Sequence, residues 1–233
     1  MNLKKFACIA GALLALAASL SAAPASRQGG RWQQWMNNYY LNPQPALVVQ
    51  AAHALSDSGY FEQPGAVATS IGFFSQVFAA HPEQVDSWLA RTSDLPQNHR
   101  RLIAVAAWYA GAPSGEKLLR QLGVSSAYRA ELERTISLVE GNVTTTPVLS
   151  ESSMNLQWGA FLATGADKHV VSILTGMGRG NLAESARVVL AFNAAQHDRV
   201  LEICRQQLDR QPNEVRSILR AVINDVERKE PTT

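Results

Sequence analysis

Three glycines that precede a predicted helix are among the residues whose spacing could support chemistry. Gly176, Gly178 and Gly180 belong to the stretch Thr-Gly-Met-Gly-Arg-Gly-Asn. Phosphate-binding loops use such glycines so that backbone N–H groups can approach an anion at a helix N-terminus. Residues 170–174, however, have helical rather than strand character, and no Gly-Lys-Ser/Thr follows. We therefore expect a turn between two helices here, and no cofactor.

Histidine and cysteine side chains could bind a metal or act in catalysis. The histidines are His53, His81, His99, His169 and His197. No two of them stand four residues apart, and no His-Glu-x-x-His motif occurs, so a zinc site would need scattered ligands. Cys204 lies in an apolar helical stripe and is expected to be a buried, unreactive thiol. These patterns predict no metal site.

Candidate nucleophiles and acids are equally sparse. No Gly-x-Ser-x-Gly motif is present, and Ser114 is interpreted as a helix cap. Glu151 and Glu62 remain as carboxylates that could serve a cell-wall hydrolase, but no paired carboxylates stand out. The sequence therefore assigns no catalytic residue.

Aromatic side chains crowd the first predicted helix of the exported chain. Four of them have the spacing i, i+3, i+7 and i+8, which gives one broad face. Such a face either covers a core or forms an exposed surface for a partner. A basic cluster farther along could be a solvated rim or a site for an acidic partner. The candidate partner-binding residues are Trp32, Trp35, Tyr39, Tyr40, Arg100 and Arg101.

The N-terminus has the features of a secretory signal. Lys4 and Lys5 precede an apolar run, residues 6–20, and small residues follow. The run is too short for a stable membrane span. Ala23 and Ala25 satisfy an A-x-A rule, so we expect residues 1–25 to be removed by cleavage after Ala25, in the periplasm or on secretion.

Loss of that signal would leave a chain of zero formal charge. The whole chain has 21 Lys plus Arg and 19 Asp plus Glu, and the signal carries two lysines and no acid. A neutral chain has no electrostatic attraction for nucleic acid or anionic lipid. One cysteine would remain, so no intramolecular disulfide is possible and stability must come from the packed core.

The remaining chain is predicted to be all-α, with about eleven helices. Apolar residues recur at helical spacing, and the alternation typical of strands is nearly absent. Two apolar stripes are Val67–Ile71–Phe74–Phe78 and Val215–Leu219–Val222–Val226. Prolines mark expected helix starts and glycines mark expected ends, and Asn181 with Glu184 has the pattern of a cap. These residues are Pro64, Pro82, Pro96, Pro212, Gly111, Gly123 and Gly141.

Weak internal repeats suggest how these helices are arranged. After a flexible lead, 26–30, we expect one helical subdomain over 31–140 and a helical-hairpin subdomain over 151–233. Residues 141–150, with a Thr run before Pro147, form either a linker between them or a surface loop within one domain. Similar segments recur about thirty residues apart, which favours an irregular, solenoid-like (tetratricopeptide-like) stack of antiparallel helices.

Two segments carry a family resemblance. The run Trp158-Gly159-Ala160-Phe161-Leu162-Ala163-Thr164-Gly165, with Val170 and Ile173, resembles a block in a group of uncharacterised exported bacterial α-helical proteins with tetratricopeptide-like hairpins. The run from Ser58 through Phe74, with His81-Pro82 and Trp88, is similar to that group as well. The chain departs from the group in lacking an acidic residue directly after Gly165. The resemblance implies a fold and a compartment, but no chemistry.

Together these patterns predict an exported helical protein that binds a protein or peptide partner without catalysis. Two alternatives stay open: an immunity-type protein that neutralises a periplasmic toxin, and a cell-wall hydrolase that uses a carboxylate such as Glu151 or Glu62.

Overall fold

The computed structural model describes residues 27–123, 143, 147–177 and 182–228, and these residues contain helices but no strand. The all-α prediction is therefore confirmed for this part of the chain. The first helices are α2 (Arg27–Asn37), α3 (Val48–Asp57), α4 (Ala66–Ala80), α5 (Val85–Arg91), α6 (Gln97–Tyr109) and α7 (Pro113–Gln121). They are followed by α9 (Glu151–Thr164), α10 (Asp167–Met177), α11 (Ala183–Gln196), α12 (Asp198–Gln207) and α13 (Asn213–Glu227). Short 3₁₀ turns are η2 (Tyr39–Leu41), η3 (Pro45–Leu47), η4 (Tyr60–Glu62) and η5 (Pro82–Gln84).

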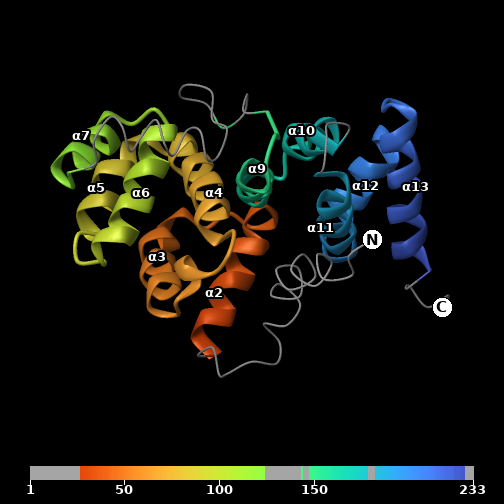
Figure 1. Ribbon diagram of the computed structural model, residues 1–233. Coiled ribbons are helices and arrows are strands. Elements are labelled where there is room, and N and C mark those ends of the chain that lie inside the picture. Colours follow the sequence, from red (N-terminus) through yellow and green to blue (C-terminus); the bar gives the residue numbers. More distant parts are fainter. Residues whose placement is uncertain (1–26, 124–142, 144–146, 178–181, 229–233) are drawn as a thin grey trace, which may run out of the picture.

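Helices α4 and α9 form the centre of the molecule (Figure 1). The helices α3, α5, α6 and α7 lie on the α4 side, where α6 packs on α4 and α7 packs on α6. The helices α10 to α13 lie on the α9 side, each in contact with its neighbours in the chain. Within the described residues, no helix has the length and apolarity needed to cross a bilayer.

The α4–α9 contact is unusually close because each helix presents a glycine to the other. A Cβ atom on Gly72 would lie 2.0 Å from the carbonyl oxygen of Leu156, and one on Gly159 would lie 1.9 Å from that of Thr69. Glycine therefore lets the two backbones touch, and no other residue fits at either position without moving the helices apart. Phe73 follows Gly72 on α4, Phe161 lies two residues after Gly159 on α9, and both are fully buried.

Local signals fix the ends of α9. Ser150 caps its start: Ser150 Oγ accepts from the Ser153 backbone N–H at 3.1 Å, and Ser153 Oγ accepts from the Ser150 N–H at 2.9 Å. This reciprocal pair satisfies donors that the first turn leaves free. Gly165 ends the helix with φ = +63°, and its N–H donates to the Phe161 carbonyl at 2.7 Å.

Most of the expected apolar stripes are buried. Ile71, Phe74 and Phe78 are at most 1% exposed, and the whole stripe of α13 is buried. Val67 is an exception, because it is 43% exposed in the first turn of α4. Ser114 is also not a cap, because α7 begins at Pro113 with Ala112 before it.

Several sequence predictions fall on residues outside the described ranges. These are the signal, half of the 141–150 segment (Gly141, Asn142 and 144–146), Asn181, Gly178 and Gly180. Gly111 and Gly123 follow α6 and α7 with positive φ, as predicted for helix ends.

Candidate functional site

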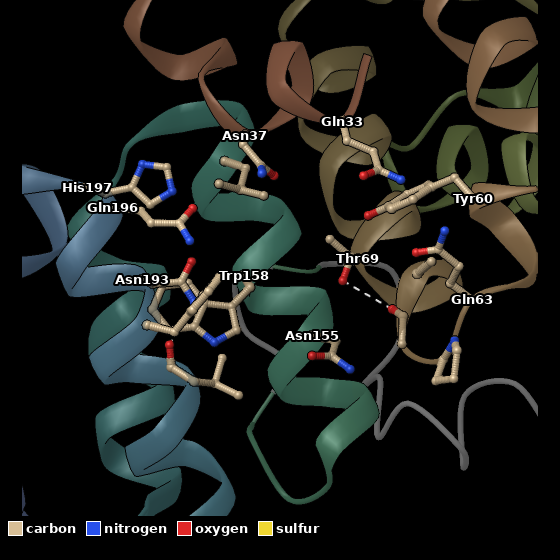
Figure 2. Close-up of a pocket in the computed structure, with 16 residues that line it drawn as sticks. Gln33, Asn37, Tyr60, Gln63, Thr69, Asn155, Trp158, Asn193, Gln196 and His197 are labelled. Carbon is tan, nitrogen blue, oxygen red and sulfur yellow. Dashed lines mark hydrogen bonds between the residues drawn. The ribbon is translucent and has the colours of Figure 1, made fainter. Parts of the chain in front are cut away.

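A groove lined mostly by neutral polar side chains lies between the two sides of the molecule (Figure 2). It has a volume of about 200 Å³ and draws its walls from α2, η4 and α4 on one side and from α9 and α11 on the other. Its most frequent lining group is the carboxamide. The six are Gln33, Asn37, Gln63, Asn155, Asn193 and Gln196. We call this site the carboxamide groove.

Helical periodicity explains how these side chains reach one place. Asn155, Trp158 and Leu162 stand at i, i+3 and i+7 of α9 and share the face that lines the groove. Leu156 and Gly159, on the neighbouring face of α9, contact α4 instead. The close α4–α9 contact therefore brings the groove residues of both helices near each other.

The groove has a buried floor and exposed edges. Trp158, Leu162, Ala66 and His197 are buried, and Phe192 is 39% exposed. Among the carboxamides, Gln63 and Gln196 are exposed and the other four are half-buried. Ligand entering from solvent would thus meet polar groups first and aromatic and aliphatic groups beneath them.

Most of the carboxamides lack a partner within the described part of the chain. Asn193 Nδ2 donates to the Val189 carbonyl at 2.8 Å. The amides of the other five make no hydrogen bond to described residues. The indole N–H of Trp158 is also buried without an acceptor there. Thr69, whose Oγ1 donates to the Gly65 carbonyl at 3.1 Å, is shown with this bond in Figure 2. Polar groups that are not bonded to described residues can exchange bonds with water for bonds with a ligand.

Gly65 and Asn155 fix one end of the groove. Gly65 has φ = +79°, and a Cβ atom there would lie 2.6 Å from Asn155 Nδ2. The absence of a side chain at Gly65 therefore leaves space for the Asn155 amide beside the start of α4.

The groove carries no formal charge at neutral pH. None of its sixteen lining residues is Lys, Arg, Asp or Glu. Burial lowers the pKa of His197, whose Nδ1 lies 3.3 Å from the Tyr40 hydroxyl, so the ring is neutral near pH 7. Burial also raises the pKa of Tyr60, which keeps its phenol protonated. The groove therefore favours uncharged ligands.

The six residues chosen from the sequence lie elsewhere. Trp32 and Tyr39 are in the core, at 4% and 3% exposure, and Trp35 packs edge-on against Phe73 with its indole N–H 3.2 Å from Gln44 Oε1. Tyr40 packs on Phe161 and on His197, and His197 lines the groove.

The helix that was expected to carry all four aromatics ends at Asn37, so Tyr39 and Tyr40 belong to η2. Arg100 and Arg101 are half-buried on α6, where Arg101 Nη2 donates to the Leu122 carbonyl at 3.1 Å. None of the six lines the groove.

A serine, a histidine and a glutamate are linked in the pattern of a hydrolase triad. His99 Nδ1 lies 2.7 Å from Ser56 Oγ, and His99 Nε2 lies 2.5 Å from Glu62 Oε1. Acyl transfer needs a nucleophile that substrate can reach, and Ser56 is only 7% exposed and does not line the groove. The three residues come from α3, η4 and α6, and they hold these elements together.

A second buried histidine has an incomplete set of partners. Gln157 Nε2 donates to the Val143 carbonyl at 2.8 Å, so its Oε1 must accept from His169 Nδ1, 2.7 Å away. His169 Nε2 is then an unprotonated, buried nitrogen without a partner in the described residues. Burial lowers the pKa of His169 to about 4. The ring is neutral at pH 7.

The other chemistry-bearing groups in the described part of the chain lie apart from the groove. Cys204 is fully buried, as predicted, and burial raises the pKa of its thiol to about 12. Glu62 and Glu151 are both exposed and lie outside the groove lining. Among the described residues, no cluster of His, Cys, Asp and Glu has a geometry that could hold a metal ion.

Comparison of the chain with protein-family models finds no match, and comparisons with curated proteins and with solved structures find none either.

Proposed function

We propose that this protein is a non-enzymatic binding protein whose carboxamide groove holds a segment of a protein or peptide partner. The observation that carries the proposal is the lining: six carboxamides, five of them unbonded to described residues, surround a floor of buried aromatic and aliphatic groups. Such a surface offers many hydrogen bonds and some apolar contact to a ligand without charge.

The titratable groups of the groove favour binding over catalysis. Acid–base catalysis works best with a group whose pKa lies near the operating pH. In the groove, burial moves the pKa of Tyr60 upward and that of His197 downward, and each change keeps the group in its neutral form. A neutral His197 that is 5% exposed and contacts Tyr40 is poorly placed to abstract a proton from a ligand.

The size of the groove favours a chain segment over a small molecule. Pockets that enclose drug-sized ligands have volumes of roughly 300–1,000 Å³. A groove of about 200 Å³ is smaller, so it suits a few residues of a longer ligand that continues beyond it.

The compartment and the finer architecture belong to the same proposal. The N-terminal Lys-Lys, apolar run and A-x-A pattern support export to the periplasm or medium. Contacts between successive helices from α9 to α13 support a solenoid-like stack of hairpins, in which a groove between hairpins is the usual place for a ligand.

The test compares groove variants with matched surface variants. Asn37→Leu and Gln196→Met keep side-chain volume but remove the amides, and Asn98→Leu and Gln50→Met do the same at exposed positions outside the groove. Each tagged protein is used to capture partners from periplasmic extract, with mass spectrometry of the bound species. We expect a species retained by the wild type and both controls and lost from both groove variants. A set of bound species that is the same for all five proteins would contradict the proposal.

A further inference from the structure

Carboxamide side chains carry the same hydrogen-bonding groups as a peptide unit. Each has a carbonyl oxygen that accepts and an NH₂ group that donates. Gln33 and Asn37 project from α2 at i, i+4 spacing, and Asn193 and Gln196 stand at i, i+3 spacing on α11. Figure 2 shows the two pairs on different elements around the same space. The groove therefore presents donors and acceptors from two walls.

An extended peptide matches this arrangement. Successive residues of a strand direct their N–H and C=O groups to opposite sides, so both walls can be bonded at once. A helical ligand would not match, because its backbone groups are already bonded within the helix. Charged side chains on the ligand would lose hydration without gaining a partner, since no lining residue carries charge.

A sugar chain is the strongest competing ligand, because hydroxyl groups also pair with carboxamides. Sugar rings generally stack on an open aromatic face. Trp158 is 4% exposed and forms the floor, and Tyr60 is half-buried, so neither offers a broad face. Phe192 is the one exposed aromatic of the lining, at its edge. The lining therefore fits a peptide main chain better than a sugar.

We infer that the carboxamide groove recognises the main chain of an extended, uncharged peptide segment, with the α2 amides and the α11 amides bonding opposite edges of that segment. This inference rests on the proposed function and deepens it. Recognition of this kind depends little on the ligand's side chains, provided they carry no charge.

The test is a scan of peptide backbone methylation. An array of eight-residue peptides built from Ala, Ser, Thr, Val, Asn and Gln serves as the probe, together with copies carrying Asp or Lys. The tightest uncharged peptide is then resynthesised with one N-methyl group at each position in turn, which removes one N–H donor. Affinities for the full chain are measured by calorimetry. We expect a loss of about tenfold at methylated positions within the groove, and a similar or larger loss for the charged copies.

Variants in each wall test which wall bonds which positions of the peptide. In Asn37→Leu, methylation at one set of alternate positions should no longer matter, and in Gln196→Met the other set should become insensitive. Asn98→Leu and Gln50→Met should reproduce the wild-type pattern. This coupling is the expected signature of a direct bond between a wall and an alternate ligand residue.

Three other outcomes would overturn the inference, and two of them would also overturn the proposed function. Peptides that bind through the groove but tolerate methylation everywhere would overturn main-chain recognition and leave the proposed function intact. Binding of chitin oligosaccharides that is lost in Asn37→Leu, with no peptide binding, would overturn both in favour of a sugar. A protein that binds none of the array would overturn both.

Discussion

The contact between α4 and α9 and the carboxamide groove beside it lie close together but differ in packing and in polarity. At Gly72 and Gly159 the two backbones touch, with no room for a single added carbon. Beside this contact, the side chains of Thr69 on α4 and Asn155 on α9 line the carboxamide groove. The tight contact leaves no space between the helices, whereas most carboxamides of the groove have no hydrogen-bond partner among the described residues.

The difference shows how the proposed binding groove can be present at little cost in stability. Unbonded carboxamides destabilise a fold only where they are buried, and those of the groove are half-buried or exposed, where water can bond them. The close α4–α9 contact fixes the positions of Asn155 and Trp158 relative to Thr69. The groove therefore depends on the contact for its shape, and the two can be separated by mutation.

The largest expected effect comes from adding a methyl group at the tight contact. Gly159→Ala or Gly72→Ala should lower the free energy of unfolding by about 3 kcal/mol, because a Cβ so close to a carbonyl oxygen forces the helices apart. Urea denaturation monitored by tryptophan fluorescence measures this. Gly30→Ala in α2 is the matched control: nothing lies within 4 Å of its added Cβ, so better helix propensity should raise stability by up to about 1 kcal/mol. Equal stability of Gly159→Ala and wild type would show that the contact is looser than described.

A smaller loss of stability is expected at acidic pH, through a residue on a third face of α9. Gln157 there bonds the buried His169, whose pKa of about 4 lies below the value near 6.5 of the unfolded chain. Between these values the unfolded chain binds a proton that the folded chain does not. Stability is therefore complete above about pH 6.5 and is lost as pH falls toward 4.

We expect this histidine to contribute a loss of about 2 kcal/mol between pH 7.5 and pH 5. The measurement is urea denaturation at both pH values, with His169→Asn as comparator, because asparagine can keep a donor to Gln157 but does not titrate. The variant should lose less stability than the wild type over this range. An identical pH dependence in both proteins would assign the acid sensitivity to other groups, including His197, whose pKa is also lowered.

The smallest expected effect on stability comes from a substitution at the carboxamide groove. Gly65→Ala places a side chain at φ = +79° and against the Asn155 amide, and should cost about 1 kcal/mol. The same change should weaken ligand binding more than it weakens the fold, because the displaced amide belongs to the groove. Parallel denaturation and binding measurements test this, with Gly111→Ala as the control: it too has positive φ, at +79°, but no atom lies near its added Cβ. An equal loss of affinity in both variants would show that Asn155 does not contribute to ligand binding.

Helical periodicity predicted much of the fold but little of the site. Phe74 and Phe78 were correctly expected in the core because spacing alone identifies a buried stripe. The contact of Gly72 with Gly159 could not be predicted, since a glycine inside a helix does not indicate which distant backbone approaches it.

The carboxamides were missed for a different reason. Gln33 and Asn37, or Asn193 and Gln196, have helical spacing, but so do polar residues on any solvated helix face. What distinguishes them is that six such residues from separate elements meet around Trp158, and that depends on tertiary packing. The aromatic residues chosen instead, such as Trp32, were conspicuous by type and are buried in the core.

The glycine contact also constrains the order in which the chain can fold. Gly72 and Gly159 are far apart in sequence, and such contacts form late because a long loop must be closed first. Until α9 has been synthesised, the face of α4 around Gly72 lacks its cover, and the apolar side chains beside it stay open to solvent. The nascent N-terminal helices therefore form an unfinished core. The apolar surface of α4 is therefore completed only when the residues of α9 are available to cover it.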